Sequence, residues 1–74
     1  MKVLFFGVLA DVTGNSAIEM EASDLDTLKK NLSAKFPMLN QYRFQWAVNK
    51  EKAEKNMMLN SNDEIALLPP FAGG

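Results

Sequence analysis

The residues best suited to chemistry lie at the C-terminus of the chain. The sequence closes on Gly73 and Gly74, preceded by Pro69 and Pro70. Two residues without side chains can enter a narrow channel and bring a terminal carboxylate against the catalytic groups of another protein. The prolines cannot donate to a strand ladder and favour an extended backbone at the root of this tail. We therefore predict that the working group is the carboxylate of Gly74, and not a side-chain active site.

Side-chain chemistry is restricted by the residue types that are missing. The chain contains no Cys and no His, so it has no thiolate nucleophile, no imidazole acid or base and no Cys/His zinc site. Gly7 and Gly14 are isolated, and no phosphate-binding loop is present. A carboxylate reacts with sulfide or amines only after its oxygen becomes a leaving group, as in an acyl-adenylate. We therefore expect a partner enzyme to activate the carboxylate with ATP, and no cofactor to bind this chain.

Length and composition predict one small globular domain. The chain has 74 residues, of which 47% are hydrophobic and 23% are charged, enough for a single core but not for two. We expect residues 1–70 to form the domain and residues 71–74 to form an extended, flexible C-terminal tail. The formal net charge of −1 supplies no uniform field to gather phosphates or anionic lipid, so neither nucleic acid nor a membrane is an expected partner.

The N-terminal apolar run mimics a signal peptide, with Lys2 placed ahead of it. The run breaks at Asp11 without a convincing cleavage site and is too short to span a membrane. Residues 3–9 are therefore predicted to form a central strand that is covered on both faces. We expect the protein to be cytoplasmic.

Turn signals and periodicity divide the rest of the chain. Residues 13–16 favour a turn, and the alternation over residues 18–22 predicts a strand that pairs with the first as a β-hairpin. Ser23 is predicted to cap a helix that ends before Pro37. The apolar positions of this helix recur at spacings of three and four: Leu25, Leu28, Leu32 and Phe36.

The second half of the chain predicts the remaining strands. Residues 38–43 are irregular, with a short helical turn, and residues 44–48 favour a third strand. Residues 50–56 form a solvated hairpin or loop, and residues 60–63 a turn before the last strand at 64–68. This order predicts an α+β fold of the β-grasp type. It has a mixed sheet of about four to five strands, one main helix packed across it, and the first and last strands side by side.

Trp46, Met57 and Met58 have the residue types of a ligand pocket. Aromatic and Met side chains at strand spacing more often serve as packing, so we assign these residues to the core or to an edge of the sheet.

The two ends of the sequence resemble the small subunit of molybdopterin synthase. The resemblance covers nearly the whole chain, and its most specific part is the Pro-Pro-x-x-Gly-Gly terminus. The matching segments are residues 1–7 with Asp11 and Gly14, then 47–49, 62–66 and 68–74. In that family the fold is a β-grasp, as in ubiquitin and in the sulfur carrier of thiazole synthesis. A turn that is often Gly-Asp in the family is Asn62-Asp63 here.

The resemblance implies a function for the C-terminal residues. An ATP-dependent adenylating enzyme of the ubiquitin-activating type activates Gly74, and a sulfur donor then converts it into a thiocarboxylate. The loaded tail enters the large subunit of the synthase, with Gly73 and Ala72 fitting the channel. There it donates sulfur that converts cyclic pyranopterin monophosphate into the dithiolene of molybdopterin. The family synthase is a heterotetramer with two small subunits at opposite ends of a large-subunit dimer.

We predict a partner-binding surface next to the tail if no other element packs on one face of the sheet. Its apolar side chains, together with Pro70 and Phe71, would then form a patch suited to burying a partner. We hypothesise that the large subunit covers this patch.

Three other functions remain open from the sequence. The first is a carrier for thiazole synthesis or for another sulfur-containing metabolite. The second is a ubiquitin-like modifier, in which Gly74 becomes amide-bonded to lysines of target proteins. The third is a plain binding module whose Gly-Gly end is incidental.

Overall fold

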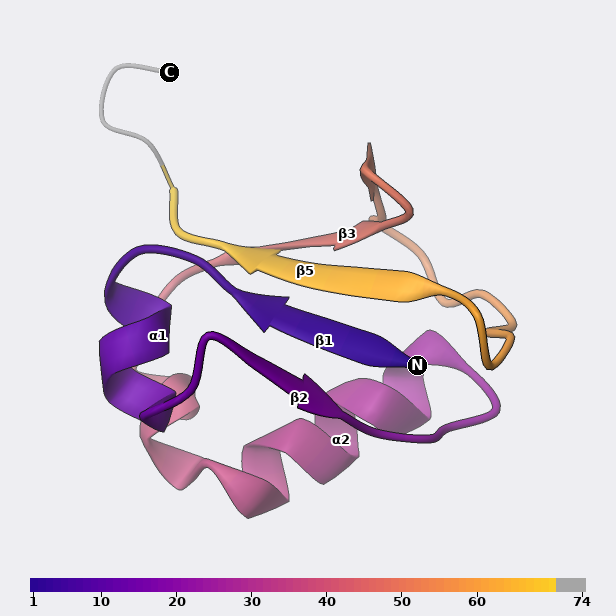
Figure 1. Cartoon of the computed structure of the whole chain (residues 1–74). Helices are drawn as coiled ribbons and strands as arrows, with labels where there is room; N and C mark the ends of the chain where they lie inside the picture. Colours follow the sequence, from indigo (N-terminus) through magenta and orange to yellow (C-terminus); the bar gives the residue numbers. More distant parts are fainter. Residues whose placement is uncertain (71–74) are drawn as a thin grey trace.

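A mixed sheet with its helices on one side forms the body of the protein (Figure 1). The computed structural model describes residues 1–70. The elements in chain order are β1 (Lys2–Phe5), α1 (Val8–Thr13), β2 (Ala17–Glu19), α2 (Leu25–Lys35), the 3₁₀-helix η1 (Pro37–Gln41), β3 (Gln45–Val48), β4 (Glu51–Lys52) and β5 (Glu64–Leu68).

The sheet has five strands in the order β2-β1-β5-β3-β4. Strands β1 and β5 are parallel, with Val3 opposite Ile65 and Phe5 opposite Leu67, and every other neighbouring pair is antiparallel. A parallel pair built from the first and last strands needs a crossover, which the rest of the chain supplies. The predicted α+β fold of the β-grasp type, with these two strands side by side, is therefore confirmed.

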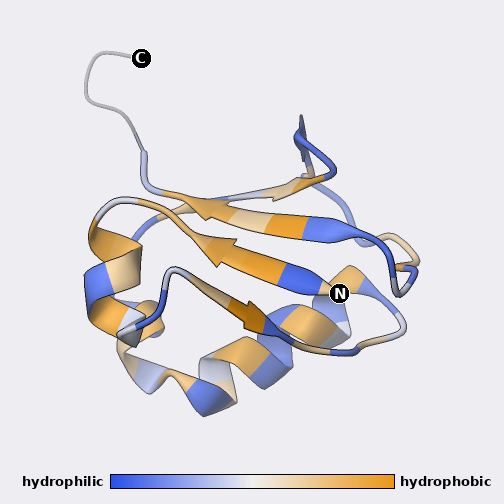
Figure 2. Ribbon diagram, in the orientation of Figure 1, coloured by the Kyte–Doolittle hydropathy of each residue, from blue (hydrophilic) through white to orange (hydrophobic). Residues whose placement is uncertain are grey.

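The core forms where α2 packs against the two central strands. Leu25 and Leu28 of the helix and Ile65 of β5 are each 0% exposed and belong to one apolar cluster. Figure 2 shows the matching pattern, with apolar residues along β1 and β5 and polar residues interspersed on α2. Fully burying such a side chain stabilises the fold by about 1.5–3 kcal/mol. The predicted helix is confirmed, with Leu25, Leu28 and Leu32 as its buried positions. Phe36, the fourth predicted position, follows the helix as its C-cap and is half-buried.

The prediction of one strand over residues 3–9 is wrong beyond Phe5. Gly7 has φ 57° and ψ −134°, a region that only glycine adopts readily, and the chain turns there into α1. Leu9 and Thr13 then face inward four residues apart, and the Thr13 hydroxyl donates to the Leu9 carbonyl at 3.0 Å. Strands β1 and β2 do pair antiparallel. They are joined through α1, however, and not through the tight hairpin turn that the sequence predicted.

Two boundaries near the start of α2 also differ from the prediction. Strand β2 ends at Glu19 instead of running over residues 18–22, and the helix cap is Asp24 instead of Ser23. The Asp24 carboxylate accepts from the Thr27 amide at 3.3 Å. The carbonyl of Ser23 accepts instead from the Leu59 amide at 3.0 Å. Pairing with the distant 57–59 segment therefore fixes where the helix begins.

Asn56 completes this cap from 30 residues further along the chain. Its side chain accepts from the Asp26 amide at 2.8 Å and donates to the Asp24 carboxylate at 2.9 Å. The hydrogen bonds from Thr27 and Asn56 lower the pKa of Asp24, against the opposing effect of partial burial. The cap is thus shared between the helix and the loop before β5.

The connection after β3, which the sequence left open as a hairpin or a loop, begins as a hairpin with β4 as its short second strand. Asn49 and Lys50 have φ values of 51° and 73°, which match a two-residue turn with both central residues left-handed. The Asn49 side chain donates to Asp63 at 2.9 Å and accepts from the Glu64 amide at 2.9 Å. The turn is thereby tied to the start of β5.

Trp46 lies where the sequence placed it, at the margin of the core. It is half-buried against the core cluster, 5.5 Å from the ring centre of Phe44, and the Lys29 ammonium lies 5.4 Å from its ring centre. Met58 is 75% exposed and forms an isolated bridge with Asp24.

Within residues 1–70, no helix has the length and apolar character needed to cross a membrane.

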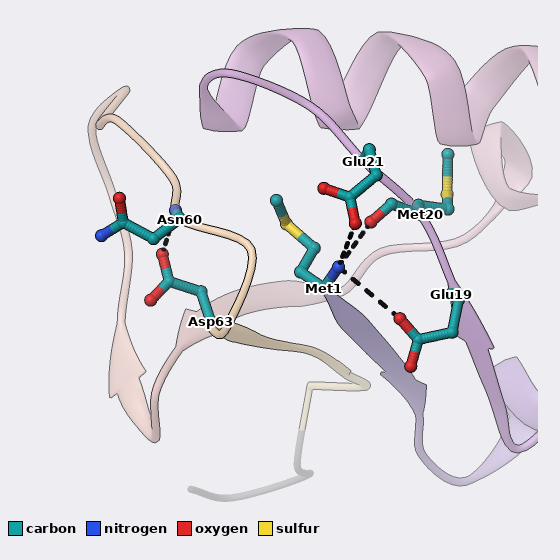
Figure 3. Close-up of polar contacts among 6 residues, drawn as sticks. All are labelled: Met1, Glu19, Met20, Glu21, Asn60 and Asp63. Carbon is teal, nitrogen blue, oxygen red and sulfur yellow. Dashed lines mark hydrogen bonds and ion pairs between the residues drawn. The ribbon is translucent and has the colours of Figure 1, made fainter.

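The α-amino group of Met1 is held at the edge of the sheet between β1 and the end of β2 (Figure 3). It donates to the Met20 carbonyl at 2.8 Å and to the Glu21 carboxylate at 3.0 Å, and the Glu19 carboxylate lies at 3.6 Å. The hydrogen bond to Glu21 is the main cause that raises the pKa of this ammonium above its ordinary value of 8.0, while desolvation acts in the opposite direction.

The Met1 contact predicts a loss of stability in alkaline solution. Because the folded pKa is raised, the contribution is fully present below about pH 8 and is lost as the pH rises through the folded pKa. Glu21→Gln is expected to lower the melting temperature at pH 7 and to flatten its decline between pH 8 and pH 10. Thermal unfolding across this range measures both effects, with Glu51→Gln as the control. An identical alkaline decline in Glu21→Gln and the unchanged protein would contradict the assignment.

Candidate functional site

The carboxyl ends of β1 and β5 meet at one edge of the sheet because the two strands are parallel. Phe6 and Gly7 directly follow β1, and Pro69 and Pro70 directly follow β5. The ladder reaches this edge, where the Phe6 amide donates to the Leu67 carbonyl at 3.2 Å. The chain leaves the sheet here (Figure 1). We call this edge, where Pro69 and Pro70 follow the end of β5, the root.

Gly7 and Pro69 approach each other closely at this root. A Cβ atom at Gly7 would stand 3.0 Å from Cγ of Pro69, which is shorter than an ordinary carbon–carbon contact of about 3.5–4.0 Å. Pro69 is half-buried and Pro70 is exposed. The absence of a side chain at Gly7 thus makes room for the proline ring.

The face of the sheet turned away from the helices carries small and aliphatic side chains. Side chains alternate along a strand, so the residues between the core positions of β1 and β5 point to this opposite face. We call the set Leu4, Ala47, Ala66 and Leu68 the open sheet face; Leu4, Ala66 and Leu68 are half-buried and Ala47 is buried. Within residues 1–70, α1 and α2 both lie on the other side (Figure 1).

Exposed apolar side chains also flank Gly7 at the root. Phe6 and Val8 are each 45% exposed, and both lie next to Gly7. An exposed apolar surface of this kind, at the point where a chain end departs, is suited to burying a partner. The condition for a partner surface, a sheet face without helices, is met within the described residues. For the same reason, the prediction that the first strand is covered on both faces is wrong.

One carboxylate with a lowered pKa, that of Asp63, lies at the other end of β5. Asp63 precedes the strand, and its pKa is lowered by hydrogen bonds from the Asn60 amide at 2.7 Å and from the Asn49 side chain. In residues 1–70, no group of three or more His, Cys, Asp or Glu side chains is placed to hold a metal ion. The carboxylates with lowered pKa values therefore serve structure, Asp63 in the turn before β5 and Asp24 in the cap of α2.

Of the predicted site residues, Pro70 lies within the part of the chain that the structure describes, and the other four lie outside it. The structure places Pro70 on the surface at the root, beside the open sheet face. Phe71, Ala72, Gly73 and Gly74 lie outside the described residues. Gly7 and the individual residues of the open sheet face were not among the predicted site residues. The available signal for Gly7 was its position, because a glycine there interrupts the N-terminal apolar run.

The comparisons with known proteins agree with the resemblance seen in the sequence. Residues 3–74 match the ThiS family. The chain is 34% identical over 80 residues to the molybdopterin synthase sulfur carrier subunit of Mycobacterium tuberculosis, covering 100% of this chain and 96% of that protein. The predicted family resemblance is thereby confirmed.

Two solved structures share the fold over their full length. One is in the complex of subunits 1 and 2 of the molybdopterin-converting factor from Helicobacter pylori, with a TM-score of 0.78, 30% identity, and coverage of 99% of this chain and 96% of that chain. The other is small archaeal modifier protein 1 of Haloferax volcanii, with a TM-score of 0.77, 26% identity, and coverage of 100% and 98%. Taken with the match over residues 3–74, these findings show that the chain belongs to the ThiS family.

Proposed function

We propose that this chain is the sulfur-carrier small subunit of a molybdopterin synthase, with Gly74 as the carrier residue. The observation that carries the proposal is the full-length match to a molybdopterin synthase sulfur carrier subunit, in a chain that ends in Gly73 and Gly74. The geometry supports it, because the root of this end lies beside an apolar sheet face.

The proposed chemistry takes place on the terminal carboxylate. An adenylating enzyme joins the Gly74 carboxylate to AMP from ATP and releases pyrophosphate, which turns one carboxylate oxygen into a leaving group. A sulfur donor at the oxidation level of sulfide then attacks the carbonyl carbon. A C–S bond forms, the C–O bond to AMP breaks, and Gly74 carries a thiocarboxylate. This chain supplies no catalytic side chain to either step, and we place the reaction in the cytoplasm, where ATP is available.

The large subunit is the proposed recipient of the sulfur. The related Helicobacter pylori structure is a complex of two subunits of the molybdopterin-converting factor. In our proposal the large subunit covers the open sheet face while Gly73 and Ala72 occupy its channel. Two small subunits then stand at opposite ends of a large-subunit dimer. The Gly74 sulfur forms a C–S bond to the pterin precursor, cyclic pyranopterin monophosphate. Water then hydrolyses the resulting thioester at the Gly74 carbonyl, which breaks the C–S bond to Gly74 and restores its carboxylate. Two such transfers supply the two sulfur atoms of the dithiolene.

Docking on the open sheet face makes a prediction for Leu68. Leu68→Asp is expected to weaken binding to the large subunit about tenfold or more, because it places a charge in an apolar contact. Phe71→Asp and Phe71→Ala test the neighbouring residue in the same way. Calorimetric titration measures the dissociation constants, with Met58→Asp as control because Met58 is 75% exposed and lies at the start of α2. Unchanged affinity in a folded Leu68→Asp variant would remove this face from the interface, and unchanged affinity in both Phe71 variants would remove Phe71.

Reconstitution of the whole reaction tests the proposed pathway. Thiocarboxylated protein is mixed with the large subunit of a related synthase and cyclic pyranopterin monophosphate, and the dithiolene product is measured. Product formation that requires the thiocarboxylate is the expected result. If the loaded protein instead supplies sulfur only to a thiazole synthase, the chain is a sulfur carrier of another pathway.

A ubiquitin-like modifier is the second candidate function. It is favoured by the similarity of the whole chain to small archaeal modifier protein 1 of Haloferax volcanii at 26% identity, and the tail chemistry begins in the same way. A modifier leaves amide-linked conjugates, which persist as high-mass bands after heating with a reducing agent. Such bands, absent when Gly74 is removed, would favour this function over the carrier.

A further inference from the structure

We propose that Gly7 is a positioning residue for the reactive C-terminus. Its contact with the ring of Pro69 sets how Pro69 and Pro70 leave the sheet at the root. A side chain at position 7 would therefore displace the Gly74 carboxylate that partner enzymes must reach. This inference rests on the proposed function of Gly74 and adds a residue at the opposite end of the sequence.

The backbone of Gly7 is fixed by what surrounds it. The Phe6 amide before it donates to Leu67 of β5 at 3.2 Å, and the Gly7 carbonyl accepts from the Ala10 amide of α1 at 3.1 Å. Helix α1 is anchored in turn by Leu9, which is 0% exposed. Gly7 is thus held on both sides by elements of the core, so it has little freedom to move away from a crowded neighbour.

Pro69 is the residue that would have to move if position 7 carried a side chain. A Cβ atom at Gly7 would lie 3.0 Å from its Cγ and 3.8 Å from its Cδ. Proline has no backbone N–H, so Pro69 cannot be held by donating to the sheet ladder. The contact with Gly7 therefore restrains the ring on one side. A methyl group at position 7 would require Pro69 to give way by a few tenths of an ångström.

A small movement at the root matters because of the length of chain beyond it. Four residues follow Pro70, and each extended residue spans about 3.3–3.6 Å. A partner enzyme that binds the domain must reach Gly74 across these four residues, so a displaced Pro69 changes the starting point from which the carboxylate is delivered. A misplacement of about 1 Å can cost on the order of a hundredfold in rate.

A double-mutant cycle separates the ring contact from the cost of the backbone conformation. Any side chain at Gly7 is disfavoured by its φ of +57°, whatever surrounds it. The four proteins are the unchanged chain, Gly7→Ala, Pro69→Ala and the double variant, because Ala at position 69 lacks Cγ and Cδ. Gly14→Ala, alone and with Pro69→Ala, is the matched control: Gly14 has φ +72°, and a Cβ atom there meets nothing within 4 Å.

The readouts are ATP–pyrophosphate exchange with an adenylating enzyme, which gives kcat/KM for activation of Gly74, and thermal unfolding. We expect Gly7→Ala to lower kcat/KM about tenfold in the unchanged background and far less in the Pro69→Ala background. Pro69→Ala alone should also lower kcat/KM, because the contact is lost. Gly14→Ala should lower the melting temperature while leaving kcat/KM unchanged in both backgrounds.

Several outcomes would overturn the inference. Additive effects of Gly7→Ala and Pro69→Ala on kcat/KM would show that the contact is not involved, and an equal loss in Gly14→Ala would assign the effect to stability. If Gly7→Ala does not fold, an unchanged kcat/KM in Pro69→Ala overturns it. Failure of the proposed function is distinct. Without activation of Gly74, the unchanged chain itself shows no exchange, and a carrier of another pathway shows exchange but forms no dithiolene product in the reconstitution described above.

Discussion

Removal of Gly74 is expected to abolish sulfur loading while leaving the fold intact. The shortened chain still ends in a carboxylate, but that group lies on Gly73 and is withdrawn by about 3.3–3.6 Å. Catalytic groups tolerate far smaller displacements, so the loading rate should fall by a factor of about a hundred or more. The core lies within residues 1–67, so the melting temperature should not change. Intact mass after timed incubation measures the rate, and loading of the shortened chain at the normal rate would contradict the prediction.

Leu28→Ala is expected to have the largest effect on stability. Leu28 is 0% exposed and lies in the cluster between α2 and the central strands. Truncating such a leucine costs about 2–5 kcal/mol, and a small domain has only about 5–15 kcal/mol of total stability. Urea unfolding measures the loss, with Met58→Ala as the control, since that side chain is 75% exposed. A loss below about 1 kcal/mol for Leu28→Ala, or an equal loss in the control, would show that the core is not built as described.

Strong periodicity made most of the fold predictable. The apolar positions of α2 recur every three or four residues, and Pro37 marks the end of the helix. The last strand is equally clear, because its apolar body is bounded by Asp63 and the two prolines. These signals come from local chemistry that the tertiary structure reinforces. The β-grasp topology then follows from placing the first and last strands together.

The N-terminal apolar run shows where local patterns fail. Continuous apolar residues are compatible with a buried strand and also with a short buried helix. Here a single residue decides between them, because Gly7 takes a backbone conformation that turns the chain into α1. The i, i+4 pair Leu9 and Thr13 is consistent with the helix, but an apolar run of this length hides that period.

The other differences arise from contacts with distant segments. Ser23 and Asp24 are both good capping residues, and the choice is made by the 56–59 segment, whose residues bond to both positions. Asn49 and Lys50 form a turn without glycine, so the usual two-residue hairpin signal is absent. These pairings join segments that are far apart in the chain, so local sequence patterns do not predict them.

The chemical end of the candidate site, Gly73 and Gly74, stays a prediction from the sequence, whereas its base could not be predicted from the sequence. Gly73, Gly74 and the two prolines were identified from residue type alone, because their use depends on having little or no side chain and a stiff root. The open sheet face depends on which side of the sheet the helices occupy, and the Gly7–Pro69 contact joins residues 62 positions apart. Both require the three-dimensional structure.

The most direct test is the intact mass of this protein after incubation with an adenylating enzyme, ATP and a sulfur source. The account predicts a mass increase equal to the replacement of one oxygen by one sulfur per chain. The increase should localise to the C-terminal peptide and be lost when ATP is omitted. An unchanged mass, with an enzyme that demonstrably loads its own carrier in the same mixture, would contradict the assignment of Gly74 as a sulfur carrier.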